Sequence, residues 1–257
     1  MNLLKVKPEN YSDYLQYINE IDFGAVYPLS IAEGLQYGEI YESEDKSSVM
    51  FWHRCGFAFL AGACDETFLE AVYELILNKN IADKRRLILF ANSTAEKDFF
   101  SVKANIVIEQ RYFFEYRNAQ PVYHTVLPDG YTIQEIDVDI LCRMQGRIVP
   151  SFSWSSDKVF LEKGKGFCIL HGDHIAAWAF SAAVSSKEID IGVETSPEYR
   201  NRGLAADVSS RMIQYVLEQN KKPVWACHAQ NMASQALAEK IGFEKTGECL
   251  IVKKEDI

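Results

Sequence analysis

The residues with the clearest chemical potential follow a predicted strand that ends in Thr195-Ser196-Pro197. The next segment, Arg200-Asn201-Arg202-Gly203-Leu204-Ala205, opens a predicted helix. The first backbone amides of a helix have no acceptors within it, and the helix dipole places partial positive charge at the same end. Gly203 lets the backbone approach a ligand closely, and the two arginines add positive charge. The segment therefore predicts an anion site that fits a pyrophosphate.

Alternating strands and helices surround this turn. From Tyr131 onward the residue pattern predicts, in order, a strand (131–135), two helices (137–146 and 156–162), a hairpin (166–170 and 174–181), a strand (188–195), a helix (201–219), a buried strand (223–227), a helix (231–241) and a last strand (245–252). Gly172-Asp173 is a two-residue turn signal for the hairpin. This order predicts an α/β layer in which helices pack on a mixed sheet.

The first half of the chain predicts a smaller α/β domain. Its expected elements are helices at 10–20 and 28–37, strands at 48–53 and 56–62, a helix capped by Asp65, a strand at 86–90, a helix at 93–103 and a strand at 106–116. Two prolines and an Asp-Gly turn lie between 121 and 130. We therefore predict domains at 1–120 and 131–257, joined by a linker at 121–130.

The phosphate turn and two later motifs resemble the GNAT superfamily of coenzyme A-dependent N-acetyltransferases. The later motifs are Asn231-Met232-Ala233-Ser234 and Ala238-Glu239-Lys240-Ile241-Gly242-Phe243, and the resemblance covers roughly residues 131–253. It implies helices on both faces of a mixed, splayed sheet, and acetyl-CoA as co-substrate. Carried over residue by residue, it implies that the coenzyme is held by Val193, Glu194, Thr195, Arg200, Asn201, Arg202, Gly203, Leu204, Ala205, Asn231 and Ser234.

The reaction that the resemblance implies is direct attack of a neutral amine on the acetyl thioester. A carboxylate or water accepts the amine proton, and Glu188, Asp190 and Glu194 are candidate bases. Strand carboxylates on a solvated face are the alternative interpretation. Many family members place a Tyr four residues before the Gly-Phe pair, where it protonates the departing thiolate, but this chain has Ala238. The acid therefore comes from elsewhere, is water, or is absent.

By the same resemblance, the acceptor enters over the first two helices of the second domain. Phe152 and Trp154, in a loop with three serines, are candidates to line that pocket, with packing anchors as the alternative. The first half repeats the order of elements, which suggests a degenerate GNAT-like copy; the alternative is the general likeness of α/β domains. Asp65 and Glu66 stand where the second half has Arg and Gly, so we expect no phosphate site there.

The composition of the chain limits the classes of binding partner and the compartment that we expect. A formal net charge of -9 argues against a nucleic-acid backbone, and it is compatible with a cationic amine. The first residues lack a signal peptide, and the longest apolar run, 175–184, is too short for a membrane helix. Six scattered cysteines suit a reducing compartment, which predicts a cytoplasmic protein. His171 and His174 have no third ligand nearby in sequence, so no metal site is expected.

The sequence thus predicts an N-acetyltransferase that acts on a primary amine of a small molecule or a protein. The first half is expected to shape the acceptor pocket or a homodimer surface. A non-catalytic protein that binds or senses acetyl-CoA is the alternative, because the Tyr is missing at Ala238.

Overall fold

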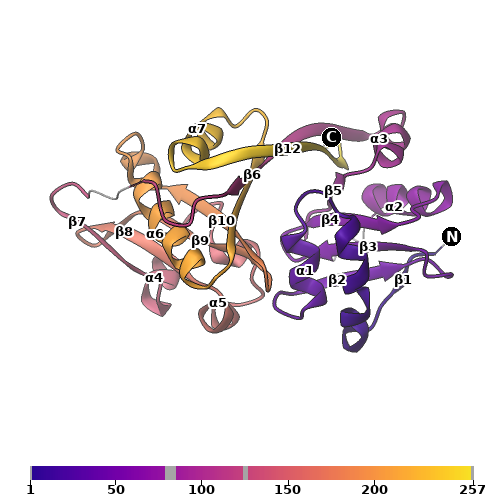
Figure 1. The fold of residues 1–257 in the computed structure, drawn as a ribbon, viewed down its shortest axis with the longest axis horizontal. Coiled ribbons are helices and arrows are strands. Elements are labelled where there is room, and N and C mark those ends of the chain that lie inside the picture. The colour runs from indigo at the N-terminus through magenta and orange to yellow at the C-terminus, as the bar shows by residue number, and fades with distance from the viewer. Residues whose placement is uncertain (1, 79–84, 124–126, 256–257) are drawn as a thin grey trace. The chain divides into compact units, whose positions relative to one another are not determined.

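The computed structural model describes residues 2–78, 85–123 and 127–255, and the chain forms two compact units (Figure 1). Unit 1 consists of residues 1–112 and 247–257, and unit 2 consists of residues 113–246. Strands β6 (Ile106–Tyr116) and β12 (Phe243–Lys254) are each divided between the units. The units therefore differ from the predicted domains, which assigned all of the last strand to the second half.

Unit 1 is a mixed sheet with helices. Its elements are β1 (Leu4–Lys5), the 3-10 helix η1 (Pro8–Glu20), α1 (Val26–Ala32), β2 (Gly38–Glu42), β3 (Ser48–His53), β4 (Phe57–Gly62), α2 (Glu66–Asn78), β5 (Ile88–Ala91) and α3 (Thr94–Ser101). Neighbouring strands from β1 to β4 are antiparallel, and β4 pairs with β5 in parallel. Residues Leu250 to Lys253 of β12 add an antiparallel strand beyond β5.

Unit 2 has the same kinds of elements. They are β7 (Tyr131–Glu135), α4 (Val138–Arg143), η2 (Pro150–Phe152), α5 (Asp157–Lys163), β8 (Gly166–His171), β9 (His174–Val184), β10 (Glu188–Thr195), η3 (Pro197–Tyr199), α6 (Leu204–Glu218), β11 (Lys222–His228) and α7 (Met232–Lys240). Strands β7 to β10 pair antiparallel in order, and β10 pairs with β11 in parallel. β6 is the neighbour of β11 on its other side.

The two halves of the chain share one order of elements. Each has a strand, a helical region, three antiparallel strands, a helix, a parallel strand, a helix and a last strand; the second half adds the short 3-10 helices η2 and η3. The last strands are exchanged, because β12 completes the sheet of unit 1 and the end of β6 lies beside β11 in unit 2. This repeated topology supports the hypothesis that the first half is a degenerate copy of the second.

Several predicted elements change in detail. The predicted helix 28–37 ends at Ala32, because Gly34 adopts a positive φ of 67°, and residues 38–42 form strand β2 instead. Of the predicted linker 121–130, residues 124–126 lie outside the part of the chain that the structure describes. The predicted strands 48–53, 106–116, 131–135 and 188–195 have the observed bounds.

Unit 2 has helices on both faces of its sheet. Phe180 in β9 packs edge-to-face on Phe160 of α5, with ring centroids 6.2 Å apart. Phe167 in β8 packs against Tyr215 of α6 on the opposite face, at 6.3 Å. The apolar side of α6, with Val208, Met212 and Val216 fully buried, follows from helical spacing. The predicted α/β class with helices on both faces is confirmed.

The sheet of unit 2 splays at β10. Its parallel pairing with β11 runs from Glu188↔Lys222 to Asp190↔Val224, whereas β10 continues to Thr195 and β11 to His228. The pairing of β10 with β9 shifts register between Asp190 and Ile191, which is the bend of a β-bulge. The two strands therefore diverge, and the second half of β10 has an edge without a ladder partner in β11. The splayed sheet predicted for this half is confirmed.

Candidate active site

A pocket of 460 Å³ opens at the carboxyl end of β10, beside the start of α6 and the exposed side of α7. It brings together every residue predicted to hold the coenzyme, from Val193 through the 200–205 turn to Ser234. Residues that the sequence did not predict also line it: Tyr199, Ala206, Ala233, Ala236, Leu237 and Lys240. Leu237 and Lys240 continue Asn231 and Ser234 at three-residue steps, and Ala233 and Ala236 are three residues apart, so helical spacing is a signal that could have located them.

The turn before α6 presents a row of free amides. Asn201 and Gly203 adopt positive φ angles of 61° and 84°. Intrahelical bonding begins late, because the amide of Ala206 donates to the Gly203 carbonyl at 2.9 Å. The amides of residues 201–205 have no acceptor among the described residues. A Cβ built on Gly203 meets no atom within 4 Å, so the space in front of the amides is open. This arrangement suits an anion.

The two arginines of the turn differ in freedom. Arg202 donates through Nη1 to the Tyr131 hydroxyl at 2.8 Å and through Nη2 to the Glu198 carbonyl at 3.1 Å. Its guanidinium also lies over the Tyr199 ring, 5.3 Å from the centroid. Among the described residues, Arg200 makes a single long bond, from Nε to the Thr195 carbonyl at 3.5 Å. Arg202 is thus a fixed charge at the rim, whereas Arg200 keeps its terminal donors for a ligand.

Asn231 and Ser234 shape the wall formed by α7. The Asn231 side-chain oxygen caps the helix by accepting from the Ser234 amide at 3.2 Å. The Ser234 hydroxyl accepts from the Trp225 indole at 3.0 Å. Both residues line the pocket, and their engaged atoms orient the remaining polar groups, including the Asn231 NH₂.

The three candidate bases lie in different places. Glu194 lines the pocket, and its Oε2 accepts from the backbone amides of Arg147 and Ile148, at 2.9 and 2.7 Å. Asp190 is buried where the strands diverge and does not line the pocket. Glu188 lies at the opposite end of β10, roughly 20 Å along the strand from Glu194 at about 3.3 Å per residue. The structure therefore brings only Glu194 to the pocket.

Burial raises the pKa of the Glu188 carboxyl, although Lys222, with Nζ 3.9 Å from Oε1, opposes that shift. A raised pKa in the folded state means that stability falls as the pH rises through the titration of this group. We expect Glu188→Gln to have a higher Tm than the wild type at pH 7, with the difference disappearing in acid. We expect kcat/KM to stay within about twofold, because Glu188 lies away from the pocket.

Thermal unfolding from pH 3 to 8, with steady-state rates at pH 7, checks this prediction. Glu135→Gln, which removes an exposed carboxylate from another strand of unit 2, is the control. A loss of activity beyond tenfold in Glu188→Gln alone would assign this carboxylate a catalytic role.

The predicted acceptor residues do not line this pocket. Trp154 is 1% exposed, donates its indole N–H to the Ser181 carbonyl at 2.8 Å and packs on Phe160. It is a packing anchor, because a buried indole N–H needs an internal acceptor. Phe152, in η2, is half-buried. Ala238 is also fully buried, while Leu237 and Lys240 beside it line the pocket.

The counterpart of the turn in unit 1 is closed. The Gly62 amide donates to Glu20 Oε2 and the Phe68 amide donates to the Asp65 carboxylate, both at 2.8 Å. Cys64 and Phe68 are buried in the core of the unit. Carboxylates thus accept from two of the amides around this turn.

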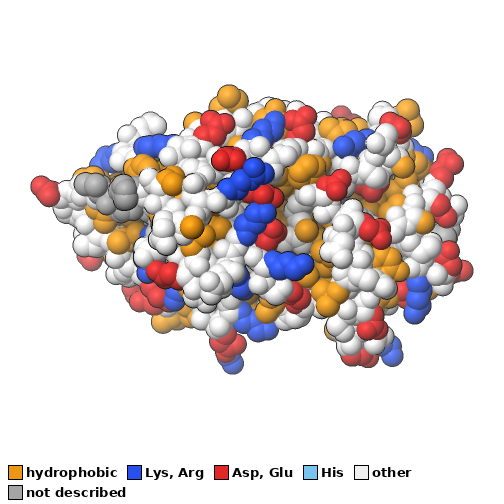
Figure 2. Space-filling view, in the orientation of Figure 1, with side chains coloured by type: hydrophobic (Ala, Val, Ile, Leu, Met, Phe, Trp, Pro, Cys, Tyr) orange, Lys and Arg blue, Asp and Glu red, His pale blue; other side chains and the backbone are white. Residues whose placement is uncertain are grey.

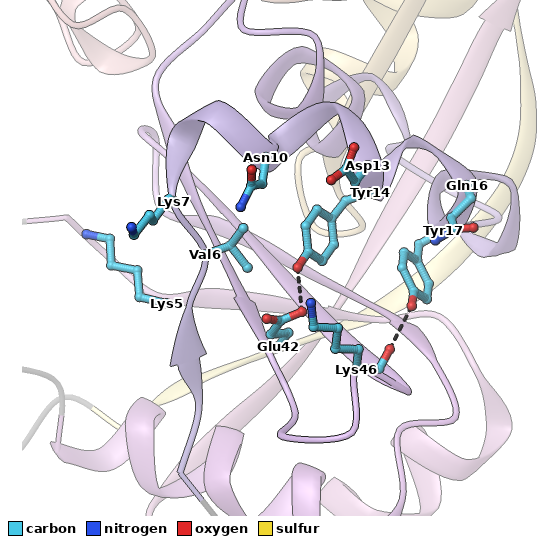
Figure 3. Close-up of a pocket in the computed structure, with 10 residues that line it drawn as sticks. All are labelled: Lys5, Val6, Lys7, Asn10, Asp13, Tyr14, Gln16, Tyr17, Glu42 and Lys46. Atoms are coloured by element: carbon cyan, nitrogen blue, oxygen red, sulfur yellow. Dashed lines mark hydrogen bonds between the residues drawn. The ribbon is translucent and has the colours of Figure 1, made fainter.

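A second pocket, of 330 Å³, lies in unit 1 between η1 and the strands β1 and β2 (Figure 3). The Tyr14 hydroxyl donates to the Glu42 carboxylate, and the Tyr17 hydroxyl donates to the Lys46 carbonyl at 2.7 Å. Burial and the Glu42 carboxylate raise the pKa of Tyr14. Lysines and carboxylates are mixed around this pocket, so it does not reproduce the anion turn of unit 2.

The surface carries charges of both signs, interspersed with apolar side chains on the face shown in Figure 2. Within the described residues, no His, Cys, Asp and Glu side chains gather into a group of three or more that suits a metal ion. No helix in the described part of the chain is long and apolar enough to span a membrane.

Comparison with known proteins places this geometry in a family. The GNAT acetyltransferase family matches residues 27–251. The uncharacterized N-acetyltransferase YdfB of Bacillus subtilis (strain 168) is 29% identical over 188 residues, which cover 72% of this chain and 70% of YdfB.

Two solved structures resemble the whole chain. A GCN5-related N-acetyltransferase-like protein from Streptococcus suis 89/1591 superposes with a TM-score of 0.73 at 23% identity, over 96% of this chain and 99% of that one. A tandem GNAT protein from the clavulanic acid biosynthesis pathway superposes with a TM-score of 0.64 at 9% identity, over 100% and 99% of the two chains. The family match spans both halves, and the anion turn and splayed strand lie within it; the chain is therefore a member of the GNAT acetyltransferase family.

Proposed function

We propose that this protein transfers the acetyl group of acetyl-CoA to a primary amine of a small molecule or a protein. The observation that carries the proposal is the row of free amides at residues 201–205, which lies beside the edge of β10 that has lost its partner strand. An anion site and an open strand edge, side by side, fit a coenzyme that has a pyrophosphate and an amide-containing arm.

The residues present fit acetyl-CoA. Amides of the turn and the Arg200 guanidinium would hold the pyrophosphate, and the backbone of Val193 to Thr195 would pair with the pantetheine arm as an added strand. The Asn231 NH₂ is the polar group of α7 suited to the pantetheine amides. The coenzyme supplies an acetyl group activated as a thioester.

The proton of the attacking amine needs an acceptor. Glu194 is the only candidate carboxylate of the three that lines the pocket, and one of its oxygens already accepts two amides. Water is the other acceptor that this chemistry allows. Ala238 is buried, so the departing thiolate takes its proton from water or from a group other than that position.

The direct test is release of free thiol from acetyl-CoA with spermidine, kanamycin, L-lysine and a peptide with a free N-terminus as acceptors. Formation of the acetylated amine is confirmed by mass spectrometry. We expect turnover with at least one amine, and loss of turnover in the double variant Arg200→Ala with Gly203→Glu. Turnover that survives in the double variant would show that the site lies elsewhere.

A non-catalytic protein that binds or senses acetyl-CoA is the second candidate, favoured by the buried alanine at position 238. Tight coenzyme binding without acetylation of any amine in the panel would favour it. We also propose a reducing, cytoplasmic setting, which agrees with all six cysteines being free thiols, five of them buried.

A further inference from the structure

The segment between α4 and η2 is held against the sheet by two side chains of the neighbouring strands. Glu194 Oε2 accepts from the amides of Arg147 and Ile148, at 2.9 and 2.7 Å. The Trp178 indole donates to the Ile148 carbonyl at 2.7 Å. Glu194 and Trp178 are register partners in β10 and β9, so their side chains share one face of the sheet. Together, the two side chains form hydrogen bonds with two backbone amides and one backbone carbonyl of this loop.

Gly146 begins the contact and shows how closely the segment packs. A Cβ built on it would lie 2.6 Å from the Trp178 ring and 2.7 Å from Glu194 Oε2. Trp178 is 1% exposed and Glu194 Oε2 is tied by two amides, so neither can move aside at low cost. Position 146 therefore requires glycine because a side chain would not fit there, and not because the backbone adopts an unusual φ angle.

Glu194 joins this loop to the pocket, because the residue lines the pocket while its Oε2 accepts from the loop amides. Phe180 and Gly192 are register partners that face α5, and Trp178 and Glu194, two residues further along each strand, face the same way. Helix α6 packs on the other face. The coenzyme turn opens α6 on that face, which leaves the face with α5 and residues 146–148 for an amine.

We propose that Glu194 is a positioning residue that holds residues 146–148 as one wall of the amine-acceptor site. This inference rests on the proposed function, because it assigns the acceptor side of the same pocket. Two consecutive amides that converge on one carboxylate oxygen form an anion-binding nest, and charge-assisted bonds of this kind are strong. Glu194 Oε2 is therefore committed to the loop, and in this proposal water accepts the proton of the amine.

Three substitutions separate this role from that of a base. Glu194→Gln keeps an oxygen that accepts both amides but cannot take a proton, Glu194→Ala removes the acceptor, and Gly146→Ala drives a methyl group into the contact. Glu135→Ala, which removes an exposed carboxylate from β7, is the matched control. Hydrogen exchange of residues 144–149, coenzyme A affinity by calorimetry, and kcat and KM for both substrates with the amines named above are measured for each.

We expect amide exchange of residues 144–149 to rise at least tenfold in Glu194→Ala and Gly146→Ala, to rise by a smaller factor in Glu194→Gln, which keeps an acceptor but loses the charge, and to stay at the wild-type rate in the control. The KM for the amine should rise at least tenfold in the first two variants and by a smaller factor in Glu194→Gln, whose side-chain oxygen still accepts from the loop amides. Unchanged exchange in Glu194→Ala overturns the proposal.

Two other results also overturn it. A loss of kcat in Glu194→Gln as large as in Glu194→Ala, with normal exchange, would make Glu194 the base. A selective loss of coenzyme A affinity would make it a coenzyme ligand. The exchange measurement needs no turnover. A failure of the acetyltransferase assay can therefore be distinguished from a failure of Glu194 to hold residues 146–148.

Discussion

Replacing Gly203 with glutamate should lower the affinity for coenzyme A by at least roughly 100-fold, or about 2.8 kcal/mol at 1.4 kcal/mol per tenfold. A Cβ at this position would meet no atom within 4 Å, and the residue lies among the free amides of residues 201–205. A carboxylate there would accept from these amides, as negative groups do at helix N-termini, and would repel the pyrophosphate. Isothermal titration with coenzyme A measures the loss.

The control must separate loss of the site from backbone strain. Gly203 has φ 84°, and a residue with a Cβ in the left-handed region costs roughly 1–2 kcal/mol. Gly172, in the β8–β9 turn, has φ 57° and equally open surroundings, so Gly172→Glu carries a similar strain and the same charge away from the pocket. We expect Gly172→Glu to lower Tm but keep coenzyme affinity. Coenzyme affinity within threefold of the wild type in Gly203→Glu would contradict the assignment of the turn.

Truncating Ile251 to alanine should destabilise unit 1 by about 2–5 kcal/mol, the usual cost of removing a buried branched side chain. Ile251 is 1% exposed and pairs with Phe90 of β5, although it lies in the last strand of the chain. Its neighbour Val252 packs in the same core as Phe68 and Val72 of α2. The unfolding free energy from urea titration gives the size of the effect.

Hydrogen exchange shows which unit loses stability. Amides of β5 and α2 should exchange faster in Ile251→Ala, while those of α6 and β10 should keep their protection. Val102→Ala, at a branched side chain of unit 1 that is 82% exposed, should stay within about 0.5 kcal/mol of the wild type. Loss of protection in α6 and β10 before β5 would instead support the predicted domain of residues 131–257.

Much of the coenzyme side of the site was predictable because its signals are local. The free amides, the glycine with positive φ and the arginines all lie within one strand-turn-helix segment, and helix termini have the same polarity in any fold. On the α7 wall, Asn231 and Ser234 came from the resemblance to the GNAT superfamily, and the other lining residues of that helix were not predicted. Strand and helix positions in the second half also follow from short-range periodicity, which explains why they agree with the structure.

The surroundings of the predicted acceptor residues and the assignment of the last strand depended on tertiary structure. Trp154 is buried, and its indole donates to the carbonyl of Ser181, which is distant in sequence. Glu194 accepts from the amides of Arg147 and Ile148, which lie in a loop whose sequence shows no periodic pattern. β6 and β12 are strands of similar kind at the ends of two similar halves, so nothing local distinguishes the sheet that each one joins. Long-range packing decides which strands pair, and in this chain the end of β12 pairs with β5 of unit 1. The anion turn is therefore a property of a short stretch of sequence, whereas the wall opposite it and the boundary of each unit exist only in the folded chain.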